Sequence, residues 1–393
     1  MFLVVSIVVK GSVDKMKVDK SKRDKLKSDK SEIDESKLVV SDIVIRPVDL
    51  DSQIELEQIV DLQVEGWNLG EEDILTPELL KICGNNGLVV GAFANDDAIS
   101  NSDNPFLVGY ALGFFSNNSG LVNSVNDFIE FGGNVPAHID KEFAVYAQRC
   151  DRDVFYSHMV ATRKSLRGKG IGALLKSFQR DECASLGMGV IEWTYDPLIS
   201  RNGKLNLNKL GAKVPAPKNY VRDYYGEISG DYKGLPTDRF IVTWDTSKKN
   251  QPPSSSKTSF DKYVSDGAKV ISSTSARLLT LSPEFLGQPE QKNKSPQSGL
   301  VYCRELKEFD LDQTADTILF EVPLNFNESD FIAADASLDS PVRLDWRTKS
   351  RAVFETYLER GYQVVDLVLK KHETQLDPFN GNGLRPFYVM QKS

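Results

Sequence analysis

The feature that most constrains this chain is a glycine-rich hexapeptide, Arg167-Gly168-Lys169-Gly170-Ile171-Gly172. Its three glycines allow tight turns and a close approach of the backbone to a ligand, which side chains would block. A helical pattern begins directly afterwards, so the positive end of a helix dipole adds to the charges of Arg167 and Lys169. The hexapeptide therefore predicts a site for a pyrophosphate group.

The flanking sequence predicts a β-α-β unit around this hexapeptide. Residues 154–161 are rich in β-branched and aromatic side chains, which is typical of a strand. Apolar residues recur at helical spacing over 171–186, and Gly187 follows as a C-terminal cap. Residues 190–195 predict the second strand.

Two protein classes place glycines in such a unit. Gly168, Gly170 and Ala173 satisfy the dinucleotide fingerprint, and Glu192 falls near the distance of its ribose-binding acid. In that fingerprint the glycines follow the strand almost directly, whereas here the polar run 162–167 intervenes. The spacing therefore disfavours a dinucleotide site.

The arginine-x-x-glycine-x-glycine pattern is the better match, and with it the chain resembles the GNAT superfamily of acyl-CoA-dependent N-acyltransferases. Within this superfamily, the chain is similar to members of a little-characterised branch of predicted GNAT acetyltransferases. The residues that carry this likeness are Asp196-Pro197-Leu198, Arg201-Asn202, Leu210-Gly211-Ala212, Tyr224-Tyr225-Gly226, Asp238-Arg239-Phe240 and Trp244. The resemblance covers residues 40–245, and more faintly 319–322, 347–365 and 387–390.

The resemblance implies an α/β (α+β) fold with a mixed, mostly antiparallel sheet flanked by helices. Strands predicted at 39–47, 88–94 and 106–115, with helices at 54–66 and 76–83, give the element order β-α-α-β-β-β-α-β that a GNAT domain requires. The insertion at 117–152 is interpreted as a substrate-side flap.

We divide the chain into four parts. Residues 1–38 form a Lys/Asp-rich tail with too little apolar surface to order, so we expect it to be disordered. The GNAT domain spans 39–245, and a Ser/Pro-rich linker follows at 246–262. Residues 263–393 are expected to form a smaller C-terminal α/β portion that packs on the GNAT domain. There we predict strands at 318–322, 362–369 and 387–390, a helix at 341–361 and a loop at 275–300.

Composition excludes several functional classes. The 48 Lys and Arg residues are outnumbered by 56 Asp and Glu, and the net charge of −8 argues against nucleic acid as a partner. Cysteines and histidines are scattered, so we expect no metal site and reduced thiols. The cysteines are Cys83, Cys150, Cys183 and Cys303, and the histidines are His138, His158 and His372. The apolar stretch 2–9 is too short to span a bilayer, so we expect a cytoplasmic protein without a membrane contact.

The resemblance assigns the residues that hold acetyl-CoA. The pyrophosphate belongs at Arg167, Gly168, Lys169, Gly170, Ile171 and Gly172, and the pantetheine arm beside the strand residues Val160, Ala161 and Thr162. Asn202 is a further candidate contact. The arm pairs with that strand through backbone groups, and a backbone N–H of the strand stabilises the oxyanion.

The resemblance leaves the general base and acid open, because two expected residues are missing. Val154, preceded by Asp153, stands where many GNAT enzymes carry a glutamate, so His158 and Glu192 are the substitutes. Leu207 stands where a tyrosine usually protonates the leaving thiolate. Tyr224 is the candidate acid, with Tyr220 and Tyr225 nearby. A buried structural role is the alternative for each.

These observations predict an N-acetyltransferase that uses acetyl-CoA, an amine acceptor, no metal and direct transfer in a ternary complex. The alternative is a non-catalytic acyl-CoA sensor that keeps the phosphate loop without base and acid. The sequence leaves the acceptor open, and the oligomeric state as well, a homodimer included.

Overall fold

The structure is a computed structural model. It describes residues 38–67, 69–94, 105–116, 119–136, 139–140, 154–217, 219–228, 230–247, 258–280, 300–324, 326–327, 329–336, 338, 341–371 and 384–392. The predicted tail, apart from Leu38, lies outside the described residues, as do Cys150, Asp153, His138 and His372.

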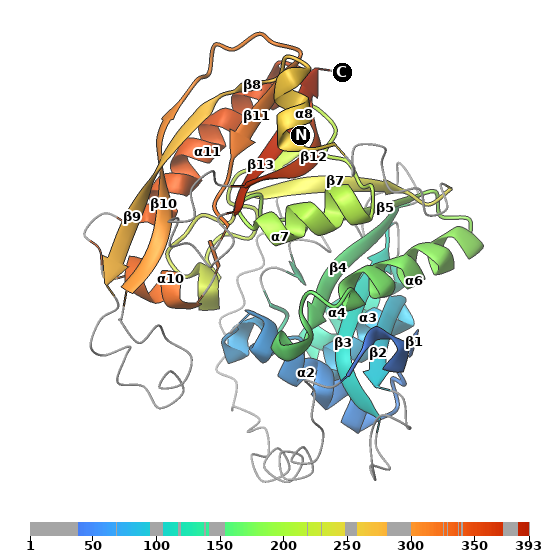
Figure 1. The fold of residues 1–393 in the computed structure, drawn as a ribbon. Helices are drawn as coiled ribbons and strands as arrows, with labels where there is room; N and C mark the ends of the chain where they lie inside the picture. Colours follow the sequence, from blue (N-terminus) through green and yellow to red (C-terminus); the bar gives the residue numbers. More distant parts are fainter. Residues whose placement is uncertain are drawn as a thin grey trace, which may run out of the picture.

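A seven-stranded sheet organises the first part of the chain, in the order β1-β2-β3-β4-β5-β7-β6 (Figure 1). Only β4 and β5 pair in parallel; the other neighbours are antiparallel. The predicted mixed, mostly antiparallel sheet flanked by helices is thus confirmed. The strands are β1 Ile43–Pro47, β2 Gly87–Ala94, β3 Phe106–Phe115, β4 Val154–Thr162, β5 Val190–Tyr195, β6 Tyr220–Val221 and β7 Arg239–Asp245.

Helices cover both faces of this sheet (Figure 1). On one face lie α2 Gln53–Trp67, α3 Pro77–Asn85 and α4 Ser119–Glu130, whose apolar residues share a core with Tyr156 of β4. The opposite face carries α6 Ile171–Ser185, with Ile171 and Leu175 buried against β2 and β3. The order β-α-α-β-β-β-α-β expected from the resemblance is present, and α4 is an addition within the insertion at 117–152.

Local sequence explains where α6 begins and ends. Gly170 precedes it with φ at 96°, and Gly187 follows it with φ at 77°. Glycine adopts this left-handed region without the steric cost that a Cβ atom brings. The predicted helix at 171–186 and strand at 190–195 are confirmed to within one residue.

The C-terminal portion builds two further sheets. A four-stranded sheet has the order β12-β13-β11-β8, and β9 and β10 form a two-stranded ribbon. The elements are α8 Phe260–Ser265, β8 Lys269–Val270, β9 Ser272–Thr280, β10 Leu300–Phe309, β11 Thr317–Glu321, α10 Ser329–Asp335, α11 Val342–Glu359, β12 Tyr362–Lys371 and β13 Leu384–Lys392.

The loop predicted at 275–300 is wrong in its first part, because 275–280 belong to β9. This strand is rich in Ser and Thr and has a single buried residue, Leu279, so it lacks the apolar alternation by which strands are identified. Its pairing with β10, not its own hydrophobicity, fixes it. Residues 281–299 lie outside the described residues.

One hydrophobic core joins the C-terminal portion to β5 and β7. The ring of Phe240 on β7 lies 4.7 Å from that of Phe354 on α11 and 5.7 Å from that of Tyr388 on β13, both edge to face. Such geometry adds to the burial of aromatic surface. In the stretch interpreted as a linker, Thr246 donates to the carbonyl of Met188, and α8 already begins at Phe260.

Candidate functional site

A gap between two parallel strands defines the site. The register of β4 with β5 covers only Val154 to Tyr156, opposite Val190 to Glu192. Beyond that point β4 stays paired with β3, and β5 with β7, so the two strands diverge. The sheet therefore opens along Ser157–Thr162, and this edge of β4 offers backbone groups to a ligand.

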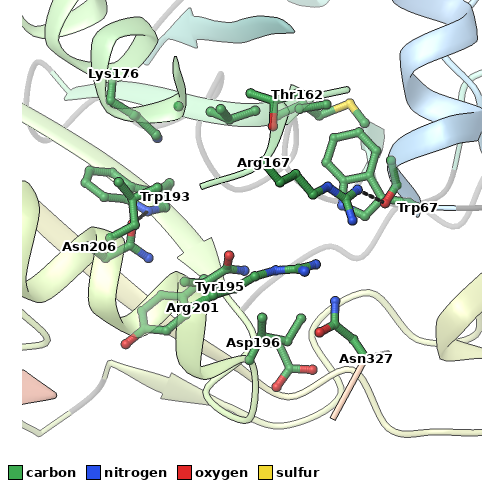
Figure 2. A pocket seen from close by; sticks show the side chains of 18 of the residues that line it. Trp67, Thr162, Arg167, Lys176, Trp193, Tyr195, Asp196, Arg201, Asn206 and Asn327 are labelled. Carbon is green, nitrogen blue, oxygen red and sulfur yellow. Dashed lines mark hydrogen bonds between the residues drawn. The ribbon is translucent and has the colours of Figure 1, made fainter. Parts of the chain in front are cut away.

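A cavity of about 550 Å³ occupies this gap (Figure 2). It brings together most of the residues predicted to bind the cofactor. Those that line it are Val160, Ala161, Thr162, Arg167, Gly168, Gly170, Ile171, Gly172 and Asn202, together with His158. Lys169 does not line it; its Nζ donates to the carbonyl of Leu38 at 2.6 Å. Glu192 and Tyr224 are also outside the lining.

The glycine loop presents open backbone at the start of α6. Gly168 and Gly170 have φ of 84° and 96°, and a Cβ atom at either position would meet no atom within 4 Å. Glycine is therefore favoured at both positions by the positive φ and not by crowding. The space beside the loop is open, as an anion cradle requires. Arg167 donates to the carbonyl of Gly66 at 3.1 Å, which holds its guanidinium at the cavity. These residues fit the pyrophosphate of a CoA thioester.

Lys176 is a cavity residue that the sequence interpretation missed. Its Nζ donates to Ser157 Oγ at 2.7 Å and lies 3.8 Å from the ring centre of Trp193. Ser157 in turn donates to Gln179 at 2.7 Å. Burial lowers the pKa of Lys176 well below its ordinary value, since the charged form loses its hydration. The signal was present in the sequence, as a lysine inside the apolar pattern of α6.

The candidate base residues occupy different surroundings. His158, on β4, lines the cavity with its ring 6.4 Å from that of Tyr156. Glu192 is buried on β5, opposite Tyr156 in the strand register. Val154, at the position where the family's glutamate is expected, is fully buried.

Tyrosine hydroxyls cluster on one side of the gap. Leu207, where the family's tyrosine is expected, is buried in the hydrophobic core, and Tyr224 is buried beside Tyr225. Tyr225 lines the cavity, and its hydroxyl lies 3.1 Å from Thr194 Oγ1. Thr194 Oγ1 lies 3.5 Å from the hydroxyl of Tyr156. Tyr225 is thus the tyrosine nearest the gap among those considered.

Asp196 lies directly after β5 and does not cap the next helix, because α7 Ser200–Gly203 begins later. Its Oδ1 accepts from the N–H of Leu198 at 2.8 Å, and Arg347 of α11 binds both carboxylate oxygens. Asp196 and Arg347 are completely buried. The carboxylate therefore anchors the C-terminal portion at the end of β5.

A π-helical segment, Lys204–Lys209, continues α7 along the cavity and gives it a polar wall. Arg201, Asn202 and Asn206 all line the cavity from these two elements. Arg167 and Arg201 extend toward the same opening from opposite walls (Figure 2). Burial raises the pKa of Asp231, another lining residue, although Arg343 and further cations oppose that rise.

Within the described part of the chain, no group of three or more His, Cys, Asp or Glu side chains could hold a metal ion. No described helix is long and apolar enough to cross a membrane. Of the four cysteines, Cys83, Cys183 and Cys303 are free and buried.

The divergent β4–β5 pair, the seven-stranded topology and the glycine loop before α6 give this part of the chain a GNAT-like fold. No protein-family model matches the sequence, and no curated protein matches it. Similar solved structures include the NatC complex bound to Gag peptide and CoA, at 16% identity, covering 52% of this chain and 98% of that chain, with a TM-score of 0.34.

Two further similar solved structures are from Drosophila melanogaster and Arabidopsis thaliana. The polyamine N-acetyltransferase of Drosophila melanogaster is 14% identical, with 52% of this chain and 100% of that chain covered, at a TM-score of 0.36. NAA60 of Arabidopsis thaliana, in complex with a bisubstrate analogue, is 11% identical, with 52% and 98% covered, at a TM-score of 0.35.

Proposed function

We propose that this protein is a GNAT-type N-acetyltransferase that transfers an acetyl group from acetyl-CoA to a primary amine within a ternary complex. The observation that carries the proposal is the cavity in the β4–β5 gap, which has the glycine loop in its wall. The loop supplies positive charge and open backbone for a pyrophosphate, and the unpaired edge of β4 accepts an extended, amide-containing arm.

The chain's residues have distinct tasks in this proposal. Gly168, Gly170 and Arg167 hold the diphosphate, and β4 from Ser157 onward aligns the arm so that the thioester lies in the gap. A neutral amine then attacks the thioester carbonyl, the C–N bond forms, and the C–S bond breaks to release the thiolate. A backbone N–H of β4 stabilises the oxyanion that develops.

Proton transfer needs a base for the acceptor ammonium and an acid for the leaving thiolate. We retain His158 and Glu192 as candidate bases. For the acid, Tyr225 is better supported than Tyr224, since Tyr225 lines the cavity and its hydroxyl approaches Thr194. We propose a cytoplasmic location, as the sequence suggests, with no nucleic acid or membrane partner, and leave a homodimer open.

A second candidate function is a non-catalytic acyl-CoA sensor. One observation favours it: Val154 and Leu207, at the positions of the family's usual base and acid, are both fully buried and apolar. Such a protein would bind acetyl-CoA in the same cavity without releasing CoA.

Two measurements test these functions. Because a ligand that binds the native state raises the melting temperature by mass action, acetyl-CoA and CoA should stabilise the protein whereas NAD and NADP should not. Release of free CoA in the presence of an amine panel then separates an enzyme from a sensor. Stabilisation by NAD or NADP alone would overturn both proposals.

A further inference from the structure

Residues on both faces of the sheet line the cavity. Trp193 and Thr194 are neighbours on β5, so their side chains point to opposite faces. Trp193 lies under Lys176 of α6, on the face that carries the glycine loop's helix. Thr194 contacts the hydroxyl of Tyr225 on the other face. If the acyl donor enters beside α6, the acceptor amine approaches from the face of Thr194 and Tyr225.

An arginine lies on this acceptor face. Arg239, the first residue of β7, lines the cavity and is 6% exposed. The centre of its guanidinium lies 5.0 Å from the ring centre of Tyr225 and 4.8 Å from that of Tyr232. One terminal nitrogen donates to the carbonyl of Asp238 at 3.3 Å. Two aromatic faces and a strand therefore fix the orientation of its planar fork.

The carboxylate nearest to Arg239 is already bound to another arginine. Arg347 binds both oxygens of Asp196, whereas Arg239 reaches one of them at 3.4 Å. The carboxylate of Asp238 is likewise bound, by Nε and Nη2 of Arg351. Two buried guanidinium groups thus share a single carboxylate at the cavity wall. A buried cation without a full counter-charge is costly, and an anionic ligand would relieve that cost.

We propose that the acceptor is an amine that also carries a carboxylate, as an amino acid does, and that Arg239 binds this carboxylate. The inference rests on the proposed function and names the substrate class of the same site. Arginine matches a carboxylate through two parallel hydrogen bonds, and it holds the acceptor with its amine directed toward the β4–β5 gap.

The test compares amino acids with the amines that remain when their carboxylate is removed: lysine with cadaverine, ornithine with putrescine, and β-alanine with ethylamine. Initial rates of CoA release should be higher for the carboxylated member of the preferred pair. Charged hydrogen bonds predict a difference of roughly 10- to 100-fold in kcat/KM. Equal or better use of the amines without a carboxylate would overturn the proposal.

Variants locate the effect at Arg239. Arg239→Gln should raise KM for the carboxylated acceptor and remove the preference within each pair, with the KM of acetyl-CoA unchanged. Arg239→Lys, which keeps the charge, should restore part of the preference. Arg222→Gln, at an exposed arginine outside the cavity lining, is the matched control. A preference that survives in Arg239→Gln would exclude Arg239 as the carboxylate ligand.

Binding measurements distinguish this proposal from the proposed function. Melting temperatures of the CoA-loaded protein with N-acetylated amino acids, and with the matching N-acetylated amines, report on the subsite without turnover. Protection by the carboxylated products alone supports the anion subsite even when no transfer is seen, in which case the enzyme proposal fails. Transfer without carboxylate preference keeps the enzyme and overturns the subsite. The subsite is also overturned if neither the N-acetylated amino acids nor the N-acetylated amines raise the melting temperature and no carboxylated amine is acetylated.

Discussion

Arg347 on α11 binds both carboxylate oxygens of Asp196, directly after β5, with Nη1 3.0 Å from Oδ1. The two residues are 151 positions apart in sequence. Asp196 lines the cavity and Arg347 does not, so through this contact the C-terminal portion supports the wall of the candidate site from behind. Neither residue is exposed, so Asp196 and Arg347 compensate each other's buried charge, with Arg239 as a second cation 3.4 Å from the carboxylate.

Removing one partner of this pair should therefore destabilise the protein strongly. We expect Arg347→Met to cost about 3–5 kcal/mol, because it leaves a buried, incompletely paired carboxylate. The melting temperature should fall by roughly 5–10 °C. The control is Arg222→Met, at an exposed ion pair with Glu355, which should melt close to the wild type. Equal melting temperatures for the two variants would show that the buried pair contributes little.

The glycine loop allows a second test with a matched control. Gly170 and Gly187 lie at opposite ends of α6, both have positive φ, and at both a Cβ atom would meet open space. At either position a glutamate should therefore lower the free energy of unfolding by a similar amount, about 1–2 kcal/mol, through backbone strain. Only at Gly170 should it add bulk and negative charge where the pyrophosphate binds. Calorimetry should show a large loss of acetyl-CoA affinity for Gly170→Glu and little for Gly187→Glu; comparable affinities would refute the loop assignment.

Lys176 predicts a pH-dependent effect on stability. Its pKa is lowered in the folded protein, so below the ordinary pKa near 10.5 the unfolded chain holds the proton more tightly and the folded state is disfavoured. This penalty fades as the pH rises toward the unfolded value. Lys176→Met should therefore raise the melting temperature most near neutral pH and progressively less toward pH 10.

The control for this comparison is Lys262→Met, at an exposed lysine on α8 paired with Asp266. It should show no such trend with pH. A melting temperature of Lys176→Met that stays below the wild type at every pH would mean that the contacts with Ser157 and Trp193 outweigh desolvation.

The parts of the fold that the sequence predicted are those with strong local signals. The glycines around α6 and the apolar alternation of β4 and β5 located the β-α-β unit to within a residue. Elements fixed by pairing with distant strands were missed, as with β9, whose Ser/Thr-rich sequence is stabilised by β10. The same limit applied to the two-residue strand β8, which pairs with β11.

In the site, too, residues with a local sequence signal were predicted and residues placed by contacts between distant segments were not. The loop and strand residues that line the cavity follow from the motif, because they are contiguous in sequence. Arg347 and Arg239 reach Asp196 only through tertiary packing, so no spacing indicates them. Lys176 was visible as a polar residue in an apolar pattern, yet its burial depends on Trp193, which lies on a different element.

The N-terminal boundary can be tested by two truncations. Removing residues 1–37 should leave melting temperature and acetyl-CoA binding unchanged, because this Lys/Asp-rich stretch has little apolar surface to bury. Removing 1–42 also deletes Leu38, which is 4% exposed and accepts a hydrogen bond from Lys169. Loss of that burial should cost about 1.5–3 kcal/mol. A fall in stability already with the shorter truncation would place part of the tail in the fold.

Single substitutions can identify the groups that transfer protons in the proposed reaction. If His158 or Glu192 deprotonates the amine, replacing it by Gln should lower the maximal rate by roughly 10² to 10⁴ fold, with acetyl-CoA affinity retained. Tyr225→Phe and Tyr224→Phe form a matched pair for the acid, since only Tyr225 lines the cavity. Tyr225→Phe should lower kcat, whereas Tyr224→Phe should lose at most stability. If all four variants keep the wild-type rate and pH profile, water and the acceptor's own pKa must carry the proton.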